Sequence, residues 1–369
     1  MIYLDSGATS FPKPPAVRRA VAQAQETCAN PGRGGYGAAM AAGNLVYSCR
    51  EAAGKLFSCQ PEQVVLTTSC THGLNIAIRT LVRPGARVAI TGFEHNAVTR
   101  PLHALGAEVL VAGRRLFDWE DTLTQFRRAL DAGAEVAVMT QVSNVFGYVL
   151  PVERMAALCR ERGVPFILDA AQGAGAMNLD FDALGAAFAA MPGHKGLLGP
   201  QGTGLLLCRE GGEPLLYGGT GSESRNQAMP DFLPDRLEPG TLNVPGFAGL
   251  AAGLRLVCAQ GPERIGLREK EQMARCARGL QSLGMEVFQG PHQAGTVSFR
   301  CGMDVEEGAR LLARQGIALR AGLHCAPLAH ESAGTLETGT LRVSFGYDTT
   351  ARQTQAFLRA ASKLPPRER

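Results

Sequence analysis

Residues 192–204 read PGHKGLLGPQGTG, a glycine- and proline-rich turn segment with an apolar run on either side. Lys195 lies within it. The chain's other lysines have polar or helical surroundings that are typical of a solvated surface: Lys13, Lys55, Lys270 and Lys363. An amine held between apolar strands beside a histidine loses its proton more easily than a solvated one, because burial and nearby positive charge disfavour the ammonium. Such an amine can form a Schiff base, although a turn lysine without chemistry fits the same residues.

The segment from about residue 60 to residue 210 alternates β-type runs with helical ones. Four runs have the composition of strands buried on both faces, namely residues 64–68, 87–91, 136–140 and 166–169. Between them, Leu123, Phe126 and Leu130 share one face of a helix that follows Asp118. This alternation predicts an α/β domain with a mostly parallel sheet, in which ligands bind beyond the carboxyl ends of the strands.

The composition shifts after about residue 245. An Ala-, Leu- and Gly-rich stretch from Gly246 to about Leu280 predicts helix, and residues 296–301 and 341–345 alternate as half-exposed strands do. Asp304 with Glu307 predicts a capping box at the start of a following helix. We therefore expect a second, smaller α+β unit in this part of the chain.

Composition and charge argue against several classes of protein. The 369 residues, 45% of them hydrophobic, suffice for two domains, and the formal net charge is +4. The charges are interspersed, so no block is suited to tracking a nucleic-acid backbone. No apolar run approaches the roughly 20 residues that cross a bilayer, and the N-terminus lacks a signal pattern, so we expect a cytoplasmic protein without membrane contact. None of the ten cysteines forms a Cys-x-x-Cys pair, which favours reduced thiols and argues against a metal site.

Three side chains near the ends of expected sheet elements suggest a cofactor. Asp169 ends an apolar run, Gln172 follows three residues later, and Lys195 lies in the next turn segment. Taken alone, Asp169 has an ordinary explanation as a helix cap. Pyridoxal phosphate needs an anion at its ring nitrogen, a donor near its ring oxygen and a lysine for its aldehyde. The three residues together therefore predict a site for this cofactor.

The phosphate of such a cofactor needs a helix N-terminus, whose free N–H groups and dipole favour an anion. Ser69, Cys70 and Thr71 lie where a strand passes through a hydroxyl-rich turn into a helix, although most hydroxyl-rich helix starts are simple caps. His95 follows another strand and is placed to stack on the cofactor ring, while a core or surface histidine is the plainer interpretation.

Several longer motifs agree with this site. They are residues 3–9 (Tyr-Leu-Asp-Ser-Gly-Ala-Thr), 142–147 (Val-Ser-Asn-Val-Phe-Gly), 169–172 (Asp-Ala-Ala-Gln), 193–195 (Gly-His-Lys) and 238–243 (Glu-Pro-Gly-Thr-Leu-Asn). In these motifs the chain resembles, nearly from end to end, the class V, fold-type I pyridoxal phosphate enzymes, and specifically the cysteine desulfurases. The resemblance implies an N-terminal arm (1–15) that joins the small domain, a large cofactor-binding α/β domain (16–245), and a linking helix with a small C-terminal α+β domain (246–369). It also implies a homodimer in which Thr241 reaches the partner's cofactor phosphate.

Residues 320–327 read RAGLHCAP and resemble the Arg-x-Gly-x-His-Cys segment of the group II desulfurases. In that subgroup the cysteine, here Cys325, is the sulfur acceptor on a short loop. His324 and Arg320 would favour its thiolate, provided that His324 is protonated or donates a hydrogen bond. Arg342 matches the family arginine that grips the substrate carboxylate, a task suited to a bidentate guanidinium.

The chain departs from the family pattern around the phosphate. Pro192 stands where a serine is common, which removes one hydroxyl and one N–H from the phosphate cup. Cys70 stands where a threonine is common, and His72 where an acidic residue often lies. The candidates that remain for phosphate contacts are Ser69, Thr71, His194 and Thr241.

From the resemblance we expect a cysteine desulfurase that converts L-cysteine to L-alanine and keeps the sulfur as a persulfide on Cys325. Lys195 would move the Cα proton, His95 would stack on the ring, and a sulfur-acceptor protein would take the persulfide. The expected cofactor contacts are Ser69, Cys70, Thr71, His95, Asn144, Asp169, Gln172, His194, Lys195 and Thr241; the expected substrate contacts are Arg342, Asn144 and Arg320. The rivals are a selenocysteine lyase, a class V aminotransferase and a non-catalytic sulfur-carrier partner.

Overall fold

A computed structural model describes residues 1–32 and 34–367. Its centre is a seven-stranded sheet in the order β2-β8-β7-β6-β5-β3-β4. The strands are β2 (Val64–Thr67), β3 (Arg87–Thr91), β4 (Glu108–Ala112), β5 (Val136–Thr140), β6 (Phe166–Asp169), β7 (Phe188–Pro192) and β8 (Gly204–Cys208). Only β8 runs antiparallel to its neighbours, so the sheet is mostly parallel as the sequence predicts.

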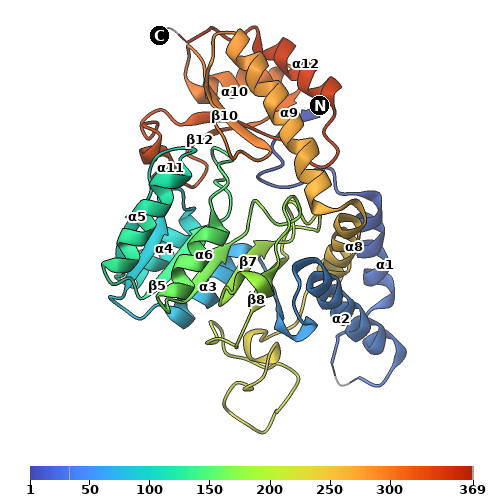
Figure 1. Cartoon of the computed structure of the whole chain (residues 1–369). Coiled ribbons are helices and arrows are strands. Elements are labelled where there is room, and N and C mark those ends of the chain that lie inside the picture. The colour runs from blue at the N-terminus through green and yellow to red at the C-terminus, as the bar shows by residue number, and fades with distance from the viewer. Residues whose placement is uncertain (33, 368–369) are drawn as a thin grey trace.

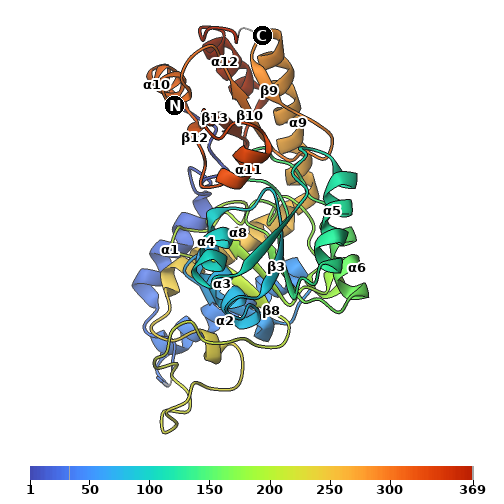
Figure 2. The same cartoon turned by 90° about the vertical axis from the view of Figure 1, so that its left-hand side faces the viewer.

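Helices cover both faces of this sheet because its strands are buried on both sides (Figures 1 and 2). One face packs against α2 (Gly37–Phe57), α5 (Trp119–Asp131), α6 (Val152–Glu161) and α8 (Val244–Gln260), and the other against α3 (Cys70–Leu81) and α4 (Asn96–Ala104). The remaining short or peripheral elements of this unit are α1 (Pro15–Thr27), α7 (Phe181–Leu184), η1 (Pro61–Gln63) and η2 (Asp235–Leu237). This layering leaves the carboxyl ends of β5, β6 and β7 at one edge, below the second unit.

The second unit is a four-stranded antiparallel sheet in the order β12-β13-β10-β9. Its strands are β9 (Glu286–Phe288), β10 (Thr296–Arg300), β12 (Arg320–Gly322) and β13 (Thr340–Ser344), and its helices are α9 (Pro262–Ser282), α10 (Val305–Arg314), α11 (Pro327–Ser332) and α12 (Ala351–Ala361). Figure 1 shows this unit above the large sheet. Its separate apolar core lies between the sheet and α9, α10 and α12.

Two local expectations need correction. The helical stretch after residue 245 is two helices, because Gly261 takes a left-handed φ of 81° and Pro262 begins α9. Asp304 caps α10 by accepting bonds from the N–H groups of Glu306 and Glu307. The expected capping box is incomplete, because the Glu307 side chain makes no reciprocal bond to the Asp304 N–H in the described structure.

The N-terminal segment connects the two units. β1 (Ile2–Tyr3) pairs in parallel with β11 (Ile317–Ala318), and Asp5 then bridges to Ser344 at the end of β13. Five residues later the N–H of Ser10 donates to the carbonyl of His194 at 2.9 Å. The segment thus passes directly beside Lys195. None of the helices in residues 1–32 and 34–367 is long and apolar enough to span a bilayer.

Candidate active site

Lys195 lies just beyond the carboxyl end of β7, on the turn that leads to β8. The turn is compact because glycine backbones pack closely: a Cβ on Gly196 would collide with the carbonyl oxygen of Ala174. Burial lowers the pKa of the Lys195 amine. Burial also lowers the pKa of His194 to about 4, with Lys195 adding to the effect, so this histidine is neutral at pH 7. The desolvation that the sequence predicts for Lys195 is therefore present.

Asp169 ends the neighbouring strand, β6, and is 3% exposed. Its Oδ1 accepts bonds from the N–H of Ala171 at 2.9 Å and from the thiol of Cys70 at 3.6 Å. Both bonds end on Oδ1, so Oδ2 is left to accept a hydrogen bond from a ligand. Because β6 and β7 are adjacent and parallel, Asp169 and Lys195 open onto the same edge of the sheet.

The hydroxyl-rich turn at the start of α3 has the geometry of a helix cap. Ser69 accepts a bond from the N–H of His72 at 3.1 Å, and α3 begins at Cys70. The N–H groups of Cys70 and Thr71 take no part in this cap, so they remain available to an anion. The side chain of His72 turns back to Thr68 and contributes nothing to the cavity.

These elements enclose a cavity of about 100 Å³ at the sheet edge. All but one of the ten expected cofactor residues line it: Ser69, Cys70, Thr71, His95, Asn144, Asp169, Gln172, His194 and Lys195, with Pro192 beside them. Thr241 does not, since it is exposed in the segment between β8 and α8. A larger cavity of about 620 Å³ shares Lys195 and Gln172 with the first and adds Ser6 and Gly7 of the N-terminal segment.

His95 is held by the helix that it begins. Its Nδ1 accepts a bond from the N–H of Ala97 at 2.9 Å, which leaves the ring proton on Nε2. Burial lowers the pKa of the imidazole, so the ring is neutral at pH 7. A neutral ring with a free Nε2–H can pack on a cofactor and donate a hydrogen bond.

Cys325 lies on the turn between β12 and α11, and its side chain is exposed. His324 and Cys325 both take left-handed backbone angles, with φ of 51° and 58°. Two bonds fix this strained turn to the cavity: Asn144 donates Nδ2 to the His324 carbonyl at 2.7 Å, and the Asn96 N–H donates to the Cys325 carbonyl at 2.8 Å. The turn is thereby attached to Asn144, which lines the cavity, while Cys325 itself is not part of the lining.

Of the two conditions under which His324 would favour the thiolate, protonation is not met. The ring is 7% exposed, and its Nε2 lies 3.2 Å from both the carbonyl and the hydroxyl of Thr340. Burial lowers the pKa of His324 well below its usual range, and Arg342 lowers it further. His324 therefore positions the turn as a neutral residue and supplies no charge to the thiol.

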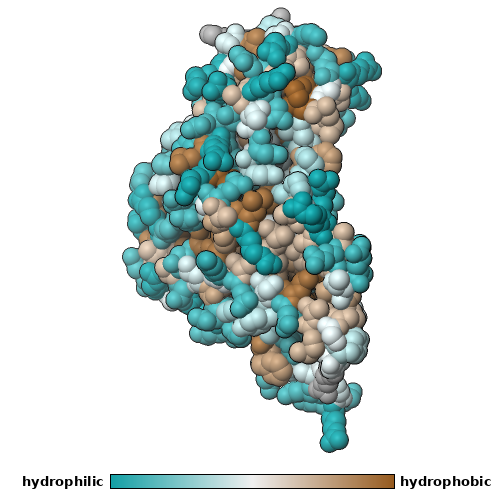
Figure 3. Space-filling model, turned by 90° about the vertical axis from the view of Figure 1, so that its right-hand side faces the viewer, coloured by the Kyte–Doolittle hydropathy of each residue, from teal (hydrophilic) through white to brown (hydrophobic). Residues whose placement is uncertain are grey.

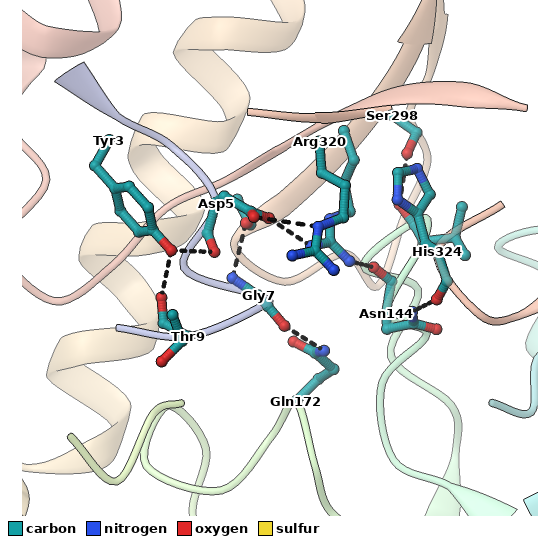
Figure 4. Close-up of polar contacts among 12 residues, drawn as sticks. Tyr3, Asp5, Gly7, Thr9, Asn144, Gln172, Ser298, Arg320 and His324 are labelled. Atoms are coloured by element: carbon teal, nitrogen blue, oxygen red, sulfur yellow. Dashed lines mark hydrogen bonds and ion pairs between the residues drawn. The ribbon is translucent and has the colours of Figure 1, made fainter. Parts of the chain in front are cut away.

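Arg342 and Arg320 come from neighbouring strands and both bind Asp5. Figure 4 shows the contact between Arg320 and Asp5. Arg342 is 2% exposed and donates to Asp5 Oδ1 at 2.7 Å and to the Asn144 carbonyl at 2.9 Å. Arg320 donates Nε to Asp5 Oδ2 at 3.2 Å. The sequence motif includes Asp5 but gives no sign of this role, because its arginine partners lie more than 300 positions away.

Glu94 is a second residue that sequence reasoning misses. It is fully buried, and its Oε1 accepts bonds from the N–H and hydroxyl of Thr91 and from the N–H of Thr140. It thus ties the ends of β3 and β5 together directly before His95. Burial raises the pKa of its carboxyl to about 8, and Asp169 adds to the effect. The sequence feature that could have pointed to Glu94 is its position directly before His95, just after the end of a buried strand.

We expect Glu94 to make the protein less stable as the pH rises. The pKa of Glu94 is about 8 in the folded state and the ordinary value is 4.5, so at a pH between these values unfolding releases a proton. The free energy of unfolding therefore falls as the pH rises from about 4.5 to about 8. Glu94→Gln cannot ionise and should lack this loss. From pH 5.5 to pH 7.5, the unfolding free energy of the wild type should fall relative to the variant by about 2–3 kcal/mol in urea titrations. The exposed Glu153→Gln serves as the control, and equal pH slopes for Glu94→Gln and wild type would contradict the assignment.

The cavity fits pyridoxal phosphate by its unused polar atoms. His194 Nδ1 and Asn144 Oδ1 are buried without a hydrogen-bond partner in the described structure, and Asp169 Oδ2 and the first N–H groups of α3 are uncommitted. Asp169 would bind the ring nitrogen, Lys195 the aldehyde and the start of α3 the phosphate. Within the described ranges, no group of three or more His, Cys, Asp or Glu residues could hold a metal ion.

Comparison with known proteins places this site in a family. The model of the aminotransferase class-V family matches residues 2–357. A probable cysteine desulfurase of Methanothermobacter thermautotrophicus is 32% identical over 96% of this chain and 92% of that protein. An apo structure of a cysteine desulfurase from Thermococcus onnurineus NA1 matches with a TM-score of 0.88 at 28% identity, over 98% of this chain and 94% of that one. The cysteine desulfurase CsdA from Escherichia coli matches with a TM-score of 0.86 at 26% identity, over the same shares of the two chains. The chain therefore belongs to the aminotransferase class-V family, whose enzymes depend on pyridoxal phosphate, and within it to the cysteine desulfurases.

Proposed function

We propose that this enzyme transfers the sulfur of L-cysteine to Cys325 and releases L-alanine, as a desulfurase of group II. The observation that carries the proposal is the placement of Cys325, exposed on a short turn whose carbonyls are bound by Asn96 and by Asn144, which lines the same cavity as Lys195. The turn is short because β12 ends at Gly322 and α11 begins at Pro327. Such a tethered cysteine agrees with the group II resemblance.

The residues of the chain divide the reaction between them. Bound pyridoxal phosphate supplies an aldehyde for the substrate amine and a ring that withdraws electrons from Cα. Lys195, with its lowered pKa, is the base that removes the Cα proton and returns one to the product. Arg342 holds the substrate carboxylate, and the neutral His95 covers the ring and donates from Nε2.

The sulfur transfer balances without any other reactant. The Sγ of Cys325 attacks the Sγ of the substrate, an S–S bond forms, and the Cβ–S bond of the substrate breaks with its electron pair left on carbon. A proton then completes the methyl group of alanine. The products are L-alanine and a persulfide on Cys325, so atoms and electrons are conserved.

We also propose a homodimer and a sulfur-acceptor protein. Large apolar side chains are exposed on α2, on the residue that precedes it and on the segment between β8 and α8: Met40, Tyr47, Tyr36, Leu216, Tyr217 and Phe232. Figure 3, a view of the side that carries α1 and α8, shows apolar surface gathered on its lower half. Thr241 is exposed near these side chains in sequence and would reach the partner's cofactor phosphate. The persulfide would pass to an acceptor because Cys325 lies at the surface. The division into arm, large domain and small domain stays a prediction.

Replacement of Cys325 by alanine tests the proposal. The variant should bind the cofactor with an unchanged absorbance spectrum and produce no alanine from L-cysteine, while mass spectrometry of the wild type should find one added sulfur on Cys325. Cys258→Ala, a partly buried cysteine on α8, is the matched control. Alanine and sulfide at the wild-type rate from Cys325→Ala would overturn the proposal, and turnover of L-selenocysteine alone would support the selenocysteine lyase instead.

A further inference from the structure

Asp5 bridges the two arginines beside the cavity. One carboxylate oxygen is bound by Arg342 at 2.7 Å and the other by Arg320 at 3.2 Å, so neither oxygen is free. The side chain of Asp5 is 14% exposed, that of Arg342 is 2% exposed and that of Arg320 is 49% exposed. Figure 4 shows Asp5 facing the guanidinium group of Arg320, with Gly7, Gln172 and Asn144 nearby.

The backbone around Asp5 holds this carboxylate in place. Asp5 pairs with Ser344, and the N–H of Gly7 donates to the Ser344 hydroxyl at 2.8 Å. The hydroxyl of Tyr3 donates to the carbonyls of Asp5 at 3.1 Å and Thr9 at 2.8 Å. The segment is therefore fixed by bonds that do not involve the Asp5 carboxylate, so its charge can be changed while these bonds remain.

The charges in this cluster add up to a single positive one. Two guanidinium groups face one carboxylate, and the acidic groups that act on Arg342 are Asp5 and, more weakly, the phenol of Tyr3. One substrate carboxylate on Arg342 makes the cluster neutral. A second carboxylate on the same substrate would meet an Arg320 that is already paired and would be repelled by Asp5.

We propose that Asp5 is a specificity-determining residue, which restricts this site to amino acids with one carboxylate by neutralising Arg320. The inference rests on the proposed function in one respect, that Arg342 binds the α-carboxylate. It concerns recognition alone, so it holds or fails separately from the sulfur chemistry.

The test is a titration of the holoenzyme with L-asparagine and L-aspartate, two amino acids of the same size that differ in one charge. Binding of either to the cofactor changes its absorbance, without any sulfur transfer. The wild type should bind asparagine more tightly than aspartate. Asp5→Asn should shift the ratio of the two dissociation constants at least about tenfold in favour of aspartate, because Arg320 becomes free to pair with the second carboxylate.

Three further variants separate charge from position. Asp5→Asn/Arg320→Gln again carries one positive charge, so its ratio should return to the wild-type value. Asp5→Glu keeps the charge and should keep the preference for asparagine. Tyr3→Phe weakens the seating of the segment without changing a charge at pH 7 and should leave the ratio unchanged.

The outcomes that would overturn the inference differ from those that would overturn the proposed function. An unchanged ratio in Asp5→Asn, or the same shift in Tyr3→Phe, would contradict a role for the charge. If Asp5→Asn bound neither asparagine nor aspartate, the role of Asp5 would be to hold Arg342 in place instead. None of these results depends on alanine production from cysteine, which tests the desulfurase activity by itself.

Discussion

Lys195→Ala should lower the rate of alanine production from L-cysteine by a factor of about 10⁴, because it removes the amine that we propose both to bind the cofactor aldehyde and to act as the base at Cα. Lys195→Arg should be equally inactive, since a guanidinium stays protonated and cannot condense with an aldehyde. Both variants should also lose the absorbance of the Schiff base and show that of the free aldehyde when pyridoxal phosphate is added. Alanine assays and absorbance spectra of the two proteins check this.

The matched control for this prediction is Lys363→Ala. Lys363 is exposed, follows α12 in the chain and does not line the cavity. Its removal should therefore leave both alanine production and the absorbance spectrum unchanged. Turnover by Lys195→Ala within about tenfold of wild type would contradict the assignment of the base. The lowered pKa of Lys195 has a further consequence: the neutral amine should be present at a lower pH than that at which a solvated lysine loses its proton.

The sheet and much of the cavity could be predicted from the sequence because their signals are local. Apolar runs of four or five residues mark β2, β3, β5 and β6, and their order with the helices implies a parallel sheet. Once the strands are parallel, their carboxyl ends must meet, so Asp169 and Lys195 fall together without any knowledge of the side chains. The Ser69 turn follows from the same rule.

The rest could not be predicted because it depends on pairs that are far apart in the chain. Asp5 and Arg342 are 337 positions apart, and Asn144 and His324 are 180 apart. No periodicity or motif links such residues. The charge state of His324 shows the same limit: its position beside Cys325 left protonation open, while burial lowers its pKa and makes it neutral. Burial is a property of the folded chain, and it decided the chemistry of that residue.

Arg50 and Glu238 form another such pair, and Arg50→Met should destabilise the protein by about 3–5 kcal/mol. Their side chains are 8% and 5% exposed, and Arg50 binds both oxygens of Glu238, at 2.7 and 2.6 Å. Glu238 also accepts a bond from the N–H of Leu66 at 2.5 Å, which attaches the 238–243 segment to β2. Without Arg50, a buried carboxylate stays desolvated and unpaired, and this cost is larger than the net value of the pair. Urea unfolding of both proteins measures the difference.

Two comparisons decide whether burial is the cause. Arg154→Met breaks an ion pair with Glu120 whose side chains are 55% and 77% exposed, so it should cost no more than about 1 kcal/mol. Arg50→Met/Glu238→Leu removes both buried charges and should recover part of the stability that Arg50→Met loses, because no buried charge is left unpaired, although the N–H of Leu66 loses its acceptor. If Arg50→Met lowered the free energy of unfolding as little as Arg154→Met does, the Arg50–Glu238 pair would not anchor the 238–243 segment. Arg50→Met should also weaken cofactor binding in the proposed dimer, because Thr241 lies three residues beyond Glu238 in the segment that the ion pair attaches to β2. Cofactor binding by the double variant would show whether this segment needs the ion pair or only a well-packed attachment to β2.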